Sequence, residues 1–274
     1  MNTGTTAESM STDTRSDDMS TVHLTATGIH KTFGEADAET TVLRGIDLDI
    51  ERGDFVAIMG PSGSGKSTLL YCLSGMDPVT QGTVTLHDGG SDAVEITALR
   101  QRDLAELRLT RMGFVFQQVH LLRNLTILDN VVLPGFTASP DERGAVVDRA
   151  RELLDLVGIG ELADREITQA SGGQLQRAAI ARALINSPDL VFGDEPTGAL
   201  NAAMAAEIMD LLTQVNREGR TVVLVTHDAN VAARANRVVV LRDGVIDGDL
   251  RRDDSQTDDQ WAESLAGWLT SHGT

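Results

Sequence analysis

The sequence has little of several features that mark other classes of protein. Among its 274 residues there is one cysteine, Cys72, so no internal disulfide can form and a reducing compartment is expected. No run approaches the roughly 18 apolar residues of a membrane helix, and no apolar signal segment begins the chain. Basic residues are also scarce, 23 against 41 acidic ones, and a net charge of −18 disfavours nucleic acid as a partner.

The two ends of the chain carry much of the acidic charge. Residues 1–20 hold four acidic residues against one arginine and lack hydrophobic periodicity, which predicts a disordered tail. Residues 253–274 form a second acidic tail, with five acidic residues and no lysine or arginine. One face of a short amphipathic helix in this second tail carries Trp261, Leu265, Trp268 and Leu269. That helix either docks on the folded core, expected over residues 21–252, or contacts a partner or the membrane surface, although its acidic residues disfavour anionic lipid.

Apolar runs typical of strands alternate with helical segments between the two ends. Residues 22–26 and 46–50 alternate apolar with polar positions, whereas residues 55–59 are continuously apolar, as in a central strand covered on both faces. Further strands are expected at residues 83–86, 113–116, 190–192 and 221–226, and helices at residues 67–75, 98–109, 125–132, 142–157 and 200–217. Asp243 and Gly244 predict a hairpin turn. The sequence therefore predicts an α/β fold with a mainly parallel sheet, an antiparallel part and a helical subdomain over residues 118–170.

A glycine-rich segment after the continuous apolar strand matches the pattern G-x-x-x-x-G-K-[ST]. It consists of Gly60, Pro61, Ser62, Gly63, Ser64, Gly65, Lys66 and Ser67, and Thr68 follows. Glycines let successive backbone N–H groups point into one anion-binding concavity, and the next helix adds partial positive charge at its N-terminus. We expect Lys66 to reach the β- and γ-phosphates of a nucleotide and Ser67 to ligate Mg²⁺. A chance Gly/Ser turn is a poor alternative, because strand, loop and helix occur in the required order.

Two carboxylates, Asp194 and Glu195, end the apolar strand near residue 190. On a parallel strand neighbouring the glycine-rich segment, they would lie beside the phosphates. Asp194 would then hold Mg²⁺, and Glu195 would polarise an attacking water molecule. Taken alone, such a pair is more typical of a solvated turn, and the glycine-rich segment makes the functional interpretation the better one.

A third motif comprises Ser171, Gly172, Gly173 and Gln174, followed by Gln176 and Arg177. Together with the two preceding motifs, it resembles the signature L-S-G-G-Q-x-Q-R of the ABC ATPases. In that family the signature binds the γ-phosphate of ATP held by another subunit, so the resemblance implies a head-to-tail homodimer or a heterodimer with another ATPase chain. A serine hydroxyl, glycine N–H groups and a helix N-terminus are suited to such a second anion site.

The resemblance assigns roles to three residues that would be ordinary on their own. Gln117 matches the glutamine that contacts the metal ion and couples the nucleotide to the membrane subunit. His227 matches the histidine that contacts the γ-phosphate, and Phe33 matches the aromatic residue that stacks on adenine. The residues expected to carry catalysis are therefore Glu195, His227 and Lys66.

Within the family, the chain is most similar to the lipoprotein-releasing and macrolide-export group. The segments that carry this similarity are residues 113–118, 121–131 and 196–200. Two positions depart from the family pattern, because Ala170 replaces a leucine and Asn201 replaces an aspartate that works across the dimer interface. Asparagine keeps hydrogen bonding but loses charge, so either hydrolysis is slower or the natural partner is a different ATPase chain.

The resemblance implies an ATP-binding and ATP-hydrolysing subunit, dependent on Mg²⁺, that powers a separate transmembrane permease in export or lipid extraction. We expect it to lie on the inner, cytoplasmic face of the membrane. One alternative is an ABC ATPase that acts on DNA or ribosomes, although the chain has neither a second ATPase domain nor a basic linker. A second is a weakly hydrolysing or non-enzymatic ATP-binding regulatory subunit, which Asn201 keeps open.

Overall fold

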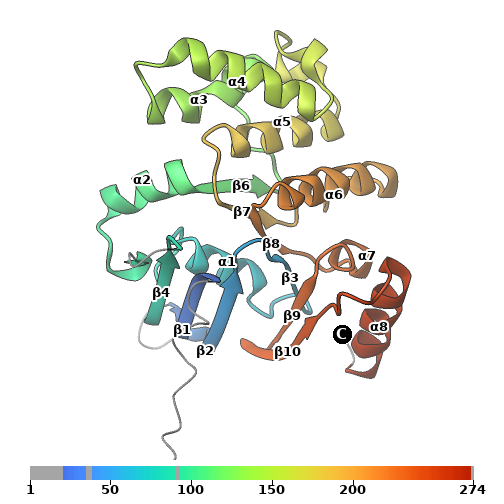
Figure 1. The fold of residues 1–274 in the computed structure, drawn as a ribbon. Helices are drawn as coiled ribbons and strands as arrows, with labels where there is room; N and C mark the ends of the chain where they lie inside the picture. Colours follow the sequence, from blue (N-terminus) through green and yellow to red (C-terminus); the bar gives the residue numbers. More distant parts are fainter. Residues whose placement is uncertain (1–20, 35–38, 90–92, 273–274) are drawn as a thin grey trace, which may run out of the picture.

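Two sheets organise the computed structural model, which describes residues 21–34, 39–89 and 93–272 (Figure 1). The larger sheet has the strand order β10-β9-β3-β8-β7-β6, and every neighbouring pair is parallel except the β9–β10 hairpin. Its strands are β3 Phe55–Met59, β6 Met112–Phe116, β7 Leu190–Asp194, β8 Thr221–Val225, β9 Arg237–Arg242 and β10 Val245–Arg251. The smaller sheet is antiparallel and comprises β1 Val22–Phe33, β2 Thr40–Glu51, β4 Gln81–His87 and β5 Ala93–Glu95. The predicted α/β class, with a mainly parallel sheet and an antiparallel part, is confirmed.

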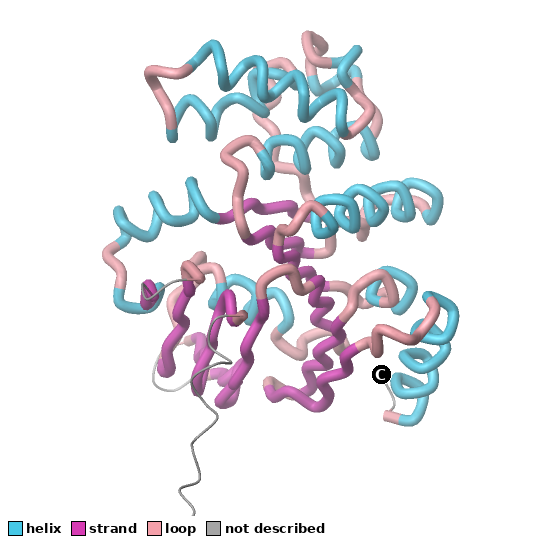
Figure 2. Tube along the Cα trace, in the orientation of Figure 1, coloured by secondary structure: helices cyan, strands magenta, loops and turns pink. Residues whose placement is uncertain are grey.

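Three helices form a separate layer, shown at the top of Figures 1 and 2. These helices are α3 Ile127–Ala138, α4 Arg143–Leu156 and α5 Gly172–Leu184. α5 packs against both α3 and α4, so the helical layer extends beyond the residue 170 at which we expected it to end. α3 also runs past the expected end at Val132 and includes Pro134. Proline cannot donate the usual helical hydrogen bond. The helix continues past Pro134 because α3 packs against α2, α4 and α5, and these contacts stabilise it.

The remaining helices lie against the sheets. They are α1 Lys66–Leu73, α2 Gln101–Arg111, α6 Ala202–Arg217, α7 Ala229–Ala232 and α8 Asp258–Ser271. Among the described residues, no helix has the length and apolar character needed to cross a membrane.

The six-stranded sheet separates two hydrophobic cores. Along β3, Phe55, Ala57 and Met59 belong to one core, and Val56 and Ile58 belong to the other. Because successive strand residues point to opposite faces, a strand between two cores must be apolar at every position. The continuous apolar run in β3 is therefore explained by burial on both faces. Cys72 is also buried, at 1% exposure, as expected for a core side chain.

The C-terminal helix α8 docks on the first of these cores. Trp261 and Leu265 are 2% and 1% exposed, and the indole N–H of Trp261 donates to the carbonyl oxygen of Ala235 at 2.9 Å. The ring of Trp268 lies where a Cβ on Gly248 of β10 would be. Of the two roles open to this helix, the structure favours docking on the core. The tail expected over residues 1–20 lies outside the described residues.

A buried histidine joins the two sheets. His23 in β1 is 2% exposed, and its Nδ1 lies 2.7 Å from Oγ1 of Thr221 in β8. Its Nε2 has no hydrogen-bond partner among the described residues. Burial, reinforced by the charge of Arg52, lowers the pKa of His23 to about 4.

We expect His23 to make the protein less stable in mild acid. The unfolded chain takes up a proton on this histidine near pH 6.5, whereas the folded chain does so only near pH 4, so stability falls as the pH drops through this window. Between pH 7 and pH 5 the wild type should lose about 2 kcal/mol more of its free energy of unfolding than His23→Leu. Urea denaturation of both proteins at both pH values measures the difference. Equal losses would show that His23 is not the group responsible.

Candidate functional site

The glycine-rich loop connects β3 to α1 and cannot be built without its glycines. Gly60 has φ 146°, and a Cβ there would overlap the carbonyl oxygen of Leu241 in β9. Gly65 has φ 100°, and a Cβ there would lie 3.0 Å from side-chain atoms of both Val42 and Leu43. The loop is thus packed against β2 and β9 as well as joined to β3, and a side chain at either glycine would disturb this packing.

Lys66 folds back over this loop. Its Nζ donates to the carbonyl oxygens of Gly60 and Pro61, both at 2.9 Å, and the residue is 8% exposed. Burial lowers the pKa of Lys66, while the nearby Glu195 and Asp194 raise it. The cavity over the loop, about 430 Å³, is lined by Val42, Ser62, Gly63, Gly65, Lys66, Ser67, Thr68 and Glu195. It therefore joins the loop to one of the two predicted carboxylates.

Asp194 lies against the start of α1. One carboxylate oxygen accepts from Oγ of Ser67 at 2.7 Å, and the other accepts from the hydroxyl of Tyr71. The neighbouring-strand interpretation was wrong, because β8 separates β3 from β7. The contact is made instead by α1, which packs across β8 and β7. The role of Tyr71 is not predictable from the sequence, since its place in an apolar run gives no sign that its hydroxyl faces Asp194.

The side chains at this point fit a magnesium ion. Ser67 and Asp194 offer hard oxygen donors that already lie within hydrogen-bonding distance of each other. No cluster of three or more His, Cys, Asp or Glu residues able to hold a metal occurs in the described part of the chain. A site with one carboxylate and one hydroxyl suits Mg²⁺, which takes its remaining ligands from water and substrate phosphates.

Glu195 follows Asp194 in a strained backbone conformation, with φ 47°. Its carboxylate lies 3.1 Å from Nδ1 of His227, just after β8. A Cβ on Gly198 would lie 2.9 Å from Nε2 of Gln117 and 3.1 Å from Oε2 of Glu195. The structure therefore brings Glu195, His227 and Gln117 to one place, and Gly198 leaves room for them to meet.

The signature residues lie on a different element, at the start of α5. Ser171 caps α5, since its hydroxyl accepts from the backbone N–H of Gln174, and the Gln174 side chain accepts from the N–H of Ser171. Gly172 and Gly173 face Leu200 and Met204 near the start of α6. Figure 1 shows α5 above β6 and β7 and α1 below them. Within one chain, the signature and the glycine-rich loop thus lie on separate elements.

Asn201 caps the helix that faces the signature. Its side-chain oxygen accepts from the backbone N–H of Met204 at 3.0 Å and so begins α6. Asparagine and aspartate cap helices about equally well. The replacement of the family aspartate therefore preserves the local fold and removes only a charge at an exposed position.

Phe33 ends β1 with its ring 44% exposed. Nζ of Lys31 lies 4.7 Å from the ring centroid, and it donates to Asp77 and to the carbonyl oxygen of Pro78, both at 2.6 Å. Phe33 pairs with Thr40 in β2, two residues before the Val42 that packs on Gly65. The exposed ring therefore lies on the same hairpin that contacts the glycine-rich loop.

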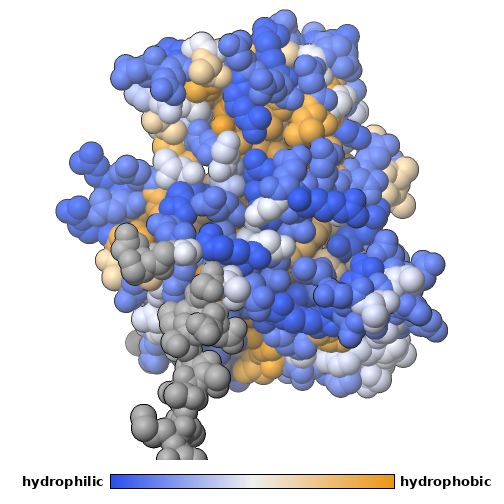
Figure 3. All heavy atoms as spheres, viewed as in Figure 1, coloured by the Kyte–Doolittle hydropathy of each residue, from blue (hydrophilic) through white to orange (hydrophobic). Residues whose placement is uncertain are grey.

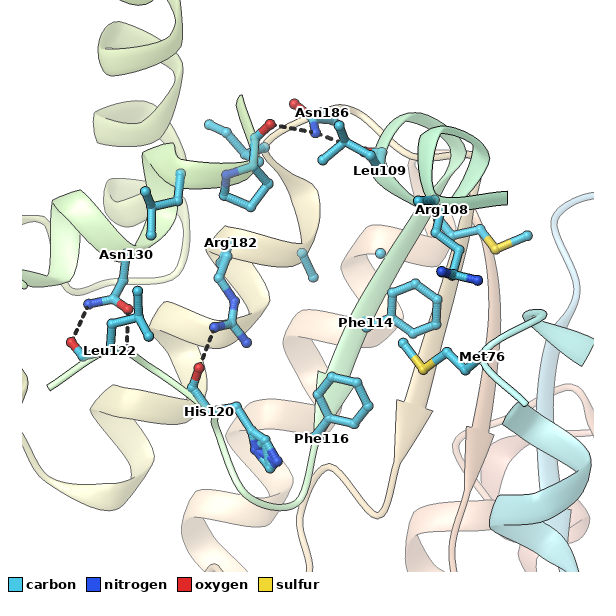
Figure 4. A pocket seen from close by; sticks show the side chains of 17 residues that line it. Met76, Arg108, Leu109, Phe114, Phe116, His120, Leu122, Asn130, Arg182 and Asn186 are labelled. Atoms are coloured by element: carbon cyan, nitrogen blue, oxygen red, sulfur yellow. Dashed lines mark hydrogen bonds between the residues drawn. The ribbon is translucent and has the colours of Figure 1, made fainter. Parts of the chain in front are cut away.

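A second cavity, about 500 Å³, lies between α2 and β6 on one side and the helical layer on the other (Figure 4). We call it the α2–α3 groove; its lining includes Met76, Arg108, Phe114, Phe116, His120, Leu122, Leu133, Arg182 and Asn186. Leu122 and Leu133 are 54% and 39% exposed. Figure 3 shows hydrophobic residues gathered where the helical layer faces the rest of the molecule. A groove with exposed apolar side chains is suited to a protein partner.

Comparison with known proteins gives a consistent result. Residues 43–198 match the family model "ABC transporter". The chain is 41% identical over 233 residues to the bacitracin export ATP-binding protein BceA of Halalkalibacterium halodurans, covering 84% of this chain and 89% of that protein. It is 45% identical over 224 residues to the macrolide export ATP-binding/permease protein MacB of Bdellovibrio bacteriovorus, covering 82% of this chain and 33% of MacB. The chain thus spans about a third of the length of the MacB relatives it matches.

Solved structures show the same similarity. The dimeric bacterial ABC transporter cassette MJ0796 superposes with a TM-score of 0.75 at 39% identity, over 84% of this chain and 99% of that one. A dimeric post-hydrolysis state of MJ0796 bound to ADP and Pi superposes with a TM-score of 0.73 at 37% identity, with the same coverage.

Proposed function

Since this chain belongs to the ABC transporter family, we propose that it is the ATP-hydrolysing motor of a membrane transporter. The observation that carries the proposal is the meeting of Lys66, Ser67, Asp194, Glu195 and His227 around one glycine-rich loop. ATP is the substrate, with its triphosphate on the loop and its adenine on the exposed ring of Phe33.

The reaction is displacement at the γ-phosphorus. Loop N–H groups and Lys66, released from the carbonyl oxygens of Gly60 and Pro61, hold the β- and γ-phosphates. Glu195 orients a water molecule and takes its proton as the water oxygen bonds to phosphorus and the bond to the bridging oxygen breaks, which leaves ADP and phosphate. His227 contacts the γ-phosphate while paired with Glu195. Mg²⁺ bound by Ser67, Asp194 and Gln117 would neutralise phosphate charge.

The complete site is formed between two ATPase chains. Ser171, Gly172, Gly173 and Gln174 would bind the γ-phosphate of ATP held by the partner, because the capped α5 start and the glycine-rich loop lie apart within one chain. ATP therefore closes the dimer and hydrolysis opens it. The dimeric cassette structures support this arrangement, and the partner is either a second copy or another ATPase chain.

A separate transmembrane permease is the proposed mechanical partner. The α2–α3 groove, with its exposed Leu122 and Leu133, supplies the docking surface. The named activities of the BceA and MacB relatives support export as the direction of transport. The proposed location is the inner face of the cell membrane.

Phosphate release by the purified chain tests the proposal. Steady release from Mg²⁺-ATP, abolished by EDTA and rising more than linearly with chain concentration, is expected for an enzyme completed by dimerisation. Binding of ATP without release would favour the regulatory-subunit alternative instead.

Asn201→Asp in the same assay measures the effect of the departure from the family pattern. The variant restores a carboxylate next to the signature and keeps the α6 cap, so we expect several-fold faster turnover or tighter ATP-dependent dimerisation. Equal turnover and equal dimerisation would refute a role for this position at the dimer interface.

A further inference from the structure

Three side-chain hydrogen bonds tie the segment around Gln117 to α5. The side-chain amide of Gln176 donates to the carbonyl oxygen of Phe116 at 3.0 Å. The guanidinium of Arg182 donates to the carbonyl oxygens of Val119 and His120 at 2.9 and 2.8 Å. Carbonyl groups on both sides of Gln117 are therefore tied to one helix, as Figure 4 shows for Arg182 and His120.

The segment needs such support because it turns sharply. His120 has φ 48°, in the left-handed region that residues other than glycine rarely adopt. Its ring stacks on that of Phe116 with centroids 5.5 Å apart, so the two ends of the turn contact each other. A backbone held in this conformation depends on the contacts around it, and Arg182 supplies two of those contacts with one side chain.

Among the described residues, the guanidinium of Arg182 donates to these two carbonyl oxygens and forms no ion pair. Burial lowers its pKa. Arg182 is partly buried, and a guanidinium withdrawn from water is costly unless its donors are used, so its two bonds to the turn stabilise both partners. Arg177, on the same helix, differs because it also pairs with Glu207 at 2.7 Å.

The segment from Gln117 to His120 begins beside Glu195, one of the residues proposed to carry hydrolysis. Nε2 of Gln117 and Oε2 of Glu195 both lie close to Gly198, and Arg182 and His120 both line the α2–α3 groove. We infer that Arg182 is a positioning residue that fixes Gln117 beside Glu195 and links the α2–α3 groove to the hydrolytic site. The inference rests on the proposed function and adds a residue through which an occupant of the groove acts on hydrolysis.

Arg182→Met tests the inference in the full-length chain. We expect kcat for ATP to fall roughly 10- to 100-fold, since small misplacements at a reacting centre have effects of this size. ATP affinity should change less than about twofold, because Phe33 and the glycine-rich loop are untouched. The Mg²⁺ concentration for half-maximal activity should rise, since Gln117 is a proposed ligand. Arg182→Lys should recover part of kcat, because an ammonium can still donate to one carbonyl oxygen.

Two controls separate positioning from general damage. Arg151→Met removes an exposed arginine from α4 of the same helical layer, one that donates to Asp164 at 3.4 Å and not to the turn, so kcat should stay within about twofold of wild type. In a Gln117→Ala background, Arg182→Met should have little further effect on kcat, because both substitutions remove the contribution of the Gln117 side chain.

The outcomes distinguish the inference from the function on which it rests. If the wild type hydrolyses ATP and Arg182→Met has the same kcat, the positioning role is overturned and the proposed function stands. The same holds if the losses of kcat in the double variant are fully additive. Absence of activity in the wild type would overturn the proposed function. Urea denaturation of each variant shows whether the compared proteins are folded.

Discussion

Replacing Glu195 with glutamine is expected to lower ATP turnover by about 10²- to 10⁴-fold while ATP binding persists. The amide has nearly the same shape as the carboxylate but cannot accept the proton of the attacking water. The loop, Lys66 and Asp194 are unchanged, so the triphosphate should bind as before. Because the intact γ-phosphate would bridge the two chains, the variant should accumulate as an ATP-bound dimer. Phosphate release and size-exclusion chromatography with ATP measure the two effects.

A matched control is Glu218→Gln, just after α6, where an exposed carboxylate pairs with partly buried Arg220 and accepts from the Gln214 side chain. Surface ion pairs of this kind contribute little, so turnover should remain near that of the wild type. Near-normal phosphate release by Glu195→Gln would remove Glu195 as the general base, and His227 would then be the next candidate.

Trp261→Ala is expected to cause the largest loss of stability, about 3–5 kcal/mol. The substitution empties a site in which the indole is 2% exposed and leaves the carbonyl oxygen of Ala235 without its donor. If the loss exceeds the free energy with which α8 docks, the helix detaches instead, and amide hydrogen exchange in α8 becomes fast. Urea denaturation and hydrogen exchange report the two outcomes.

Trp268→Ala provides the comparison within the same helix. Trp268 is half-buried and stacks on His272 at 4.0 Å between ring centroids, so its removal should cost clearly less than that of Trp261. Equal effects of the two substitutions, or no effect of either, would contradict the docking described for α8.

The sequence predicts those parts of this molecule that depend on local pattern. The apolar run of residues 55–59 identifies β3 because a strand covered on both faces has no polar position. The glycine-rich loop is recognisable because Gly60 and Gly65 adopt positive φ angles against close neighbours. Both properties follow from a few consecutive residues.

Contacts between distant segments could not be predicted in this way. Nothing near Tyr71 shows that its hydroxyl reaches Asp194, and nothing near Arg182 shows that it holds the turn after Gln117. The predicted end of α3 at Val132 is wrong for the same reason, since packing against α4 and α5 sustains the helix beyond Pro134. Strand order, too, depends on the whole sheet, and β8 was not expected between β3 and β7.

The scarcity of lysine has a practical consequence for chemical labelling. The only two ε-amino groups in the chain belong to Lys31 and Lys66, which are 7% and 8% exposed. Lys31 is engaged by Asp77 at 2.6 Å, whereas Lys66 opens onto the cavity above the glycine-rich loop and has its pKa lowered by burial. Acylating reagents modify many surface lysines of most proteins, but here the one reactive side-chain amine is that of Lys66. Slower acylation of Lys66 in the presence of a ligand would therefore report directly that the ligand occupies the glycine-rich loop.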